Sequence, residues 1–124
     1  MSADPEENRH MTVYNAQQRI TAAVQTWEGM TTAPHRFGGV EYLYGRREIG
    51  HIHGDRMVDI PFPTRVRDEI VAAGLAEPHH LLADSGWVSF YLREEAHIDR
   101  AVALLRLYYE LAARQKSRHD DPAL

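Results

Sequence analysis

Cysteine is absent from the 124 residues of the chain. This absence excludes disulfide frameworks, zinc sites with thiolate ligands and a cysteine nucleophile, so any metal ion would need histidine or carboxylate ligands. The sequence also lacks an apolar run of the ~20 residues that cross a bilayer, and its start, MSADPEENRH, lacks the layout of a signal peptide. We therefore expect a cytoplasmic protein with no membrane partner.

A concentration of positive charge is lacking as well. The formal net charge is -4, and the lysines and arginines are scattered along the chain, so we expect no nucleic-acid partner. The sequence has no Gly-x-Ser-x-Gly elbow, no Gly-x-Gly-x-x-Gly motif and no phosphate-binding loop. These absences disfavour hydrolases with a serine triad and nucleotide-binding enzymes.

The chain has the length of one domain. Polar ends predict flexible tails at 1–11 and 116–124 around a single domain at 12–115. Helical spacing of apolar residues predicts helices at 13–28, 64–73 and 95–115, and alternation predicts strands near 40–44, 48–53, 57–60 and 87–92. The predicted class is α+β, with the order α-β-β-β-α-β-α and an antiparallel sheet of about four strands packed against helices.

Histidine is abundant, with eight residues, and the densest polar stretch is RREIGHIHGD at 46–55. In a strand, His51 and His53 would point to the same side, because residues two apart share a face of the sheet. Asp55 would continue that row, whereas Glu48 would project to the opposite face. We therefore expect two neighbouring imidazoles that can share one ligand.

A second histidine group follows the middle helix, where residues 77–80 read Glu-Pro-His-His. Loops held by a rigid scaffold often carry the chemistry of a domain. Neighbouring loop residues point in different directions, so at most one of His79 and His80 is expected to turn inward. Trp87 opens the last strand and is typical of core or rim packing. His35 lies just before a glycine pair that allows a close approach to the backbone.

These residues leave three interpretations open. In the first, His51, His53 and His79 hold a catalytic metal ion that keeps one open coordination position. In the second, no metal is involved: a histidine removes a proton from an acidic organic substrate, and an arginine or a second histidine holds the resulting anion. In the third, the domain is not catalytic and binds a metabolite or a protein partner, or the histidines only satisfy backbone groups.

Three segments carry a family resemblance: RREIGHIHGD at 46–55, DEIVAAGLAEPHHLLAD at 68–84 and GWVSFYLREE at 86–95. In these segments the chain resembles the luciferase-like domain family, which comprises small bacterial proteins and the fungal luciferases. The resemblance to the bacterial members extends over about 27–113, and the resemblance to the fungal enzymes over about 46–110. The flavin-dependent bacterial luciferases and the adenylating beetle luciferases are unrelated to this family.

The resemblance implies a chemistry of oxygen without a prosthetic group. The fungal luciferases, which the chain resembles, are oxygenases. They add molecular oxygen to a hydroxylated pyranone, without flavin or nucleotide, and release carbon dioxide through a strained peroxide intermediate. By this analogy the base is His51 or His53, its partner across the pocket is His79, and Arg47 or Glu48 orients these groups.

The resulting hypothesis is a luciferase-like small-molecule enzyme or binding protein, with an oxygenase acting on a hydroxylated pyranone or a related enol as its most specific form. No cofactor is expected, while a divalent metal ion at the three histidines named above is left open. The expected partners are a small organic ligand and molecular oxygen, and a homodimer is left open. The predicted catalytic residues are His51, His53, His79 and Glu48; the predicted substrate-binding residues are Arg47, Asp55, His80, Trp87 and His35.

Overall fold

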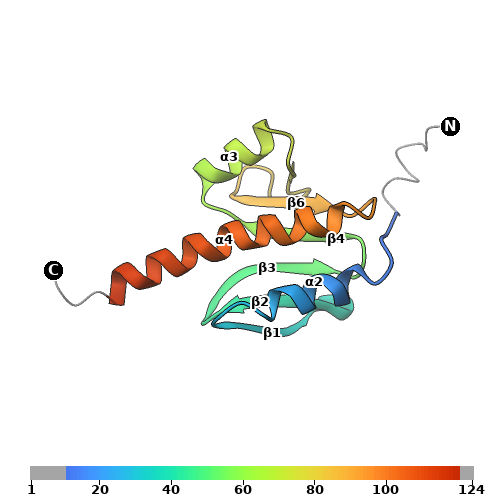
Figure 1. Cartoon of the computed structure of the whole chain (residues 1–124). Coiled ribbons are helices and arrows are strands. Elements are labelled where there is room, and N and C mark those ends of the chain that lie inside the picture. Colours follow the sequence, from blue (N-terminus) through green and yellow to red (C-terminus); the bar gives the residue numbers. More distant parts are fainter. Residues whose placement is uncertain (1–10, 121–124) are drawn as a thin grey trace.

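A computed structural model of the chain describes residues 11–120, which form a six-stranded antiparallel sheet with two helices packed on one face (Figure 1). The strand order in the sheet is β1-β2-β3-β4-β6-β5. The elements in chain order are α2 (Ala16–Val24), β1 (Met30–His35), the 3-10 turn η1 (Arg36–Gly38), β2 (Gly39–Tyr44), β3 (Arg47–His53), β4 (Met57–Pro61), α3 (Thr64–Ala72), β5 (Glu77–Pro78), β6 (Trp87–Tyr91) and α4 (His97–Asp120).

The predicted α+β class and antiparallel sheet are confirmed, and the sheet gains two strands beyond the four that were expected. Strand β1, which is not among the predicted strands, contains Pro34; it pairs only with β2 and so lies at an edge, where proline is tolerated. Strand β5 has only two residues, too few to show alternation. The last helix continues to Asp120, beyond the predicted domain end at 115, whereas residues 1–10 and 121–124 of the predicted tails lie outside the described residues.

The hydrophobic core lies between the sheet and the helices α2 and α4. Alternate residues of the central strands point into this core and are fully buried, together with apolar residues of both helices. Burial of apolar surface is the main stabilisation of a small domain. The buried residues from the strands are Tyr42, Ile49, Ile52, Val58, Ile60 and Val88.

Across residues 11–120, no helix is long and apolar enough to cross a membrane.

A β-bulge in β3 changes the face to which its side chains point. Tyr42 pairs with Gly50 and Leu43 pairs with Glu48, so Ile49 is an extra residue without a partner on β2. A bulge interrupts strict alternation. Ile49 is buried in the core, and Glu48 points to the same face as His51, because their partners Leu43 and Glu41 are two residues apart. The predicted placement of Glu48 on the opposite face is therefore wrong.

The face of the sheet opposite α2 and α4 carries a row of polar residues. Cross-strand partners share a face, and the pairings join one residue from each neighbouring strand. The row runs across β2, β3, β4, β6 and β5 through Glu41, His51, Asp59, Ser89 and Glu77.

Candidate functional site

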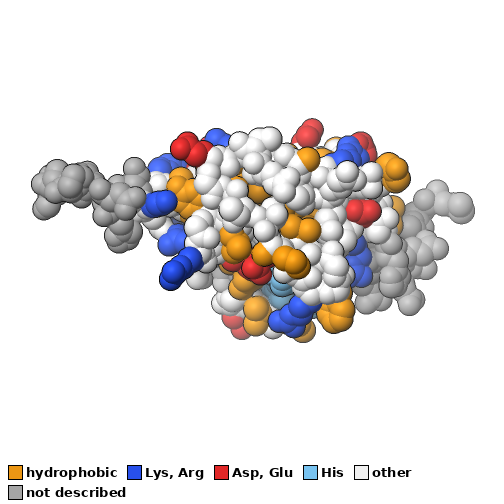
Figure 2. All heavy atoms as spheres, turned by 90° about the horizontal axis from the view of Figure 1, so that it is seen from below, with side chains coloured by type: hydrophobic (Ala, Val, Ile, Leu, Met, Phe, Trp, Pro, Cys, Tyr) orange, Lys and Arg blue, Asp and Glu red, His pale blue; other side chains and the backbone are white. Residues whose placement is uncertain are grey.

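A cavity of about 560 Å³ opens on this polar face of the sheet. Its floor is formed by β2, β3 and β4, and its walls by η1 and by the loop that follows β5. Figure 2 shows histidine surface in a hollow between hydrophobic side chains. The lining residues are His35, Arg36, Phe37, Glu41, Glu48, His51, His53, Asp59, His79, His80, Leu81, Leu82 and Trp87.

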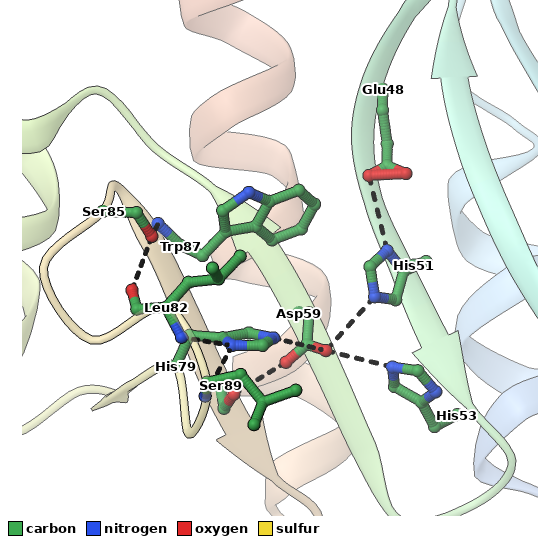
Figure 3. A network of polar contacts seen from close by, with 10 residues as sticks. Glu48, His51, His53, Asp59, His79, Leu82, Ser85, Trp87 and Ser89 are labelled. Atoms are coloured by element: carbon green, nitrogen blue, oxygen red, sulfur yellow. Dashed lines mark hydrogen bonds and ion pairs between the residues drawn. The ribbon is translucent and has the colours of Figure 1, made fainter.

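Asp59 is the centre of the polar network at the floor (Figure 3). Its carboxylate is almost completely buried, and Oδ2 lies 3.2 Å from His51 Nε2, 3.0 Å from His53 Nε2 and 3.5 Å from His79 Nε2. The Ser89 hydroxyl donates a hydrogen bond of 2.7 Å to Oδ1. Burial alone would raise the pKa of Asp59, but the hydrogen bonds from the two strand histidines and from Ser89 outweigh it and keep the pKa well below its usual range. Asp59 is therefore a buried anion.

His51 lies between two carboxylates. Nε2 faces Asp59, and Nδ1 lies 3.4 Å from Glu48 Oε2. Burial disfavours the charged imidazolium, but hydrogen bonds to Asp59 and Glu48 outweigh burial and raise the pKa of His51 to about 9. The same contact with His51 outweighs burial at Glu48 and lowers the pKa of that carboxyl. His51 is thus positively charged near neutral pH.

His79 has its ring fixed by the loop that it begins. Its Nδ1 accepts hydrogen bonds from the backbone N–H groups of Leu81 (3.1 Å) and Leu82 (3.2 Å). A ring nitrogen that accepts carries no proton, so the proton of the neutral ring is on Nε2, which faces Asp59. Burial is the main cause that lowers the pKa of His79. Both nitrogens of His79 are therefore engaged within the protein.

His35 stacks on His51, with ring centroids 4.0 Å apart and ring planes 18° apart. Its Nδ1 lies 3.5 Å from Glu41 Oε1. Burial, followed by the electrostatic influence of the neighbouring His51 and His53, lowers the pKa of His35, although Glu41 acts in the opposite direction. The cavity thus holds a neutral imidazole directly over a charged one.

The family model described as "Luciferase domain" matches residues 46–108, just over half of the chain. The chain belongs to the luciferase domain family. Comparison with curated proteins and with solved structures gave no significant match. The matched region of this luciferase domain contains Asp59 and the three histidines around it, whereas His35 and Glu41 come from the segment before it.

A metal ion was one expectation for the site, and the cavity has a group of three histidines that could hold one. One ligand nitrogen from each of His35, His51 and His53 lies within 4.8 Å of the others. This set differs from the predicted one, which had His79 in place of His35. Because imidazole lone pairs lie in the ring plane, the stacked rings of His35 and His51 direct their lone pairs side by side, so a shared ion would require one ring to turn.

The structure brings most of the predicted site residues together around this cavity. The cavity is lined by seven of the nine: Glu48, His51, His53, His79, His80, Trp87 and His35. As expected for neighbours on a loop, His79 is buried and His80 is exposed.

Arg47 and Asp55, the other two predicted substrate-binding residues, lie outside the lining of the cavity. Arg47 pairs with Tyr44 on the helix face of the sheet and donates a hydrogen bond to Gln115 of α4. Asp55 falls in the β3–β4 turn, where its carboxylate accepts a hydrogen bond of 2.9 Å from the backbone N–H of Gln17 at the start of α2. The Asp55 carboxylate thereby caps α2, whose own N-cap residue Asn15 makes no side-chain hydrogen bond.

Sequence reasoning missed Asp59, the residue at the centre of the network. It lies in the apolar stretch MVDI, and a charged residue within a buried strand is rarely unpaired. The turn between β3 and β4 pairs His53 with Met57 and therefore His51 with Asp59. Working out the register of that hairpin from its short turn would have placed Asp59 beside the histidines.

Proposed function

We propose that this luciferase-family protein is an enzyme that takes a proton from an enolic organic compound in the histidine-lined cavity and holds the enolate for reaction with molecular oxygen. The observation that carries the proposal is the stack of His35 on His51 above a buried Asp59. An acid–base reaction needs an acceptor for the proton and a fixed positive charge for the anion, and this stack supplies both within one cavity.

His35 is the proposed base. Its Nδ1 faces Glu41, so a proton on Nδ1 leaves the lone pair on Nε2. This assignment replaces the sequence-based expectation that His51 or His53 is the base. His51 already carries a proton near neutral pH, which its two carboxylate neighbours retain, so it fits the role of the group that holds the enolate oxygen.

The reaction requires only the substrate and oxygen. The enol O–H gives its proton to His35, and the enolate carbon forms a C–O bond with O2. The peroxide anion then takes the proton back from His35. The net change is insertion of O2 into a C–H bond of the keto form as a hydroperoxide, so the substrate is oxidised by two electrons and O2 is reduced to the peroxide level.

The first test uses 4-nitrophenol, whose phenolate absorbs visible light while the phenol does not. At a pH where most of the free compound is protonated, we expect the wild-type protein to increase the phenolate absorbance on binding. His35→Asn should bind the compound with a smaller increase, because His51 still stabilises the phenolate but the base that accepts its proton is gone. His97→Asn is the matched control, because His97 lies outside the cavity and an asparagine can still accept the backbone hydrogen bonds that His97 Nδ1 receives from Arg93 and Glu94.

The second test is oxygen uptake with hydroxylated pyranones in an oxygen electrode. We expect uptake by the wild-type protein to fall by about 10²-fold or more in His35→Asn, as for loss of a general base. Ionisation of bound 4-nitrophenol without uptake of oxygen for any pyranone would show acid–base chemistry of another kind. Neither ionisation nor uptake would favour the non-catalytic binding module.

A further inference from the structure

The mouth of the cavity is unusually apolar. Phe37 from η1 is fully exposed, and Leu81 and Leu82 from the loop after β5 are 78% and 49% exposed. We refer to these three residues as the apolar rim. They come from segments far apart in the sequence, yet all three line the same cavity as the histidines. In Figure 2 hydrophobic side chains lie on both sides of the histidine surface.

Hydrogen bonds fix the loop that carries the two leucines of the rim. His79 Nδ1 receives the backbone N–H groups of both leucines. Ser85 donates to the Leu82 carbonyl (2.6 Å) and accepts from the Trp87 N–H (3.1 Å), which closes the loop on itself (Figure 3). Exposed leucines on such a braced loop are not a consequence of a freely moving segment. Contact of the two leucine side chains with water is unfavourable, and the braced loop nevertheless holds both of them at the mouth of the cavity.

Phe37 is also held in an unfavourable backbone conformation. Its φ is 55° and its ψ is 38°, the left-handed region that is unfavourable for a residue with a side chain. The side chain recovers none of this cost by burial, because it is fully exposed. Strain of this kind tends to occur where a ligand is bound.

From this arrangement we infer that the apolar rim is a binding subsite for an apolar substituent of the ligand, whose acidic hydroxyl lies on the histidine floor. The ligand is thus a weak organic acid with an extended apolar group, which enters uncharged. This class follows from the change in chemistry along the cavity: the floor carries the carboxylates Glu41, Glu48 and Asp59, which would repel a ligand that enters as an anion, whereas the rim is apolar. The acidic hydroxyl of the ligand is inferred from the proposed function, on which this part of the inference rests. The apolar substituent of the ligand is inferred from the rim alone.

A series of 4-alkylphenols with increasing chain length tests the subsite, with dissociation constants measured by calorimetry. Transfer of each CH2 group from water onto the rim should tighten binding about threefold to fourfold until the rim is covered. In Phe37→Ser and Leu82→Ser this dependence on chain length should become flat. Leu75→Ser is the matched control, because Leu75 has the same exposure as Leu82 (48% and 49%) but lies outside this cavity, and it should keep the wild-type dependence.

Two results would overturn the inference: affinity that does not depend on chain length in the wild-type protein, or an unchanged dependence in both rim variants. Binding of the wild-type protein to phosphatidylcholine vesicles that is lost in Phe37→Ser, with no effect on the phenol series, would instead assign the rim to a lipid surface. Ionisation of 4-nitrophenol depends on the histidines at the floor of the cavity and not on the rim, so it tests the proposed function separately. A protein with normal dependence on chain length but no ionisation would therefore refute the proposed function and leave the subsite intact.

Discussion

The Glu48 carboxylate lies 3.4 Å from His51 Nδ1, although regular alternation along a strand would place these two side chains on opposite faces of the sheet. The bulge at Ile49 makes the contact possible by inserting one residue between them. The bulge also places the isoleucine in the core. One backbone irregularity therefore joins Glu48 to the site and completes the pair of carboxylates that keeps His51 charged.

We expect Glu48→Gln to lower the pKa of His51 from its value of about 9, because one of its two carboxylate partners becomes neutral. The change is nearly isosteric, so the fold should persist. Titration of the His51 ring signals by NMR measures the pKa directly. Glu41→Gln is the control: this carboxylate faces His35, so its neutralisation should leave the pKa of His51 above its ordinary value. An unchanged His51 pKa in Glu48→Gln would show that the contact has no energetic weight.

Asp59→Asn should have the largest effect of any single substitution at the floor. The amide removes the charge that faces three imidazoles and leaves the charged His51 without its main partner. Removing one member of a buried charged pair costs about 3–5 kcal/mol of unfolding free energy. Ser89→Ala removes only one hydrogen bond to Asp59 and should cost about 1 kcal/mol. Urea unfolding of both variants measures the difference, and equal losses would contradict a central role for the Asp59 charge.

The sequence predicted the parts of the molecule that depend on local pattern. Helical spacing located α2, α3 and α4, alternation located β2, β3, β4 and β6, and the two-residue spacing of His51 and His53 placed them side by side. What it missed depends on contacts between segments. The bulge at Ile49 is a property of the pairing of β3 with β2, and the position of Asp59 is a property of the hairpin register.

The stability of the protein should depend on pH through His51. The pKa of this group is about 9 in the folded protein and 6.5 in the reference state, so its contribution is fully present below pH 6.5 and is lost as the pH rises through about 9. The full contribution is on the order of 3 kcal/mol. In His51→Gln it is absent. The difference in unfolding free energy between wild type and variant should therefore shrink over this interval, as measured by urea unfolding at several pH values. A constant difference would contradict the raised pKa.

Gly86 lies at the end of the loop that carries the two leucines of the apolar rim, and Gly86→Ala should displace this loop. A Cβ atom at this position would lie 1.8 Å from the carbonyl oxygen of Phe62, a backbone atom that cannot simply rotate away. We expect a loss of about 1–3 kcal/mol in unfolding free energy together with weaker binding of long 4-alkylphenols. Gly45→Ala provides the comparison, since Gly45 lies away from the rim, its Cβ meets no atom within 4 Å and only its left-handed φ of 63° opposes the change. Equal binding of long 4-alkylphenols by wild type and Gly86→Ala would show that the close contact between Gly86 and Phe62 does not determine the position of the rim leucines.

Removal of metal ions tests whether the histidines act as acid–base groups or as ligands. Because His35 and His51 are stacked, their lone pairs do not converge, and we expect protein stripped with a chelator to retain the ionisation of 4-nitrophenol. Elemental mass spectrometry on untagged protein measures the metal content of the wild type, of His51→Ala/His53→Ala and of the control His97→Asn. About one ion per chain in the wild type and in the control, lost in the double variant together with ionisation of the probe, would contradict the metal-free reaction. That result would mean that one ring turns to complete the His35, His51 and His53 set, and the reaction would then be metal-assisted.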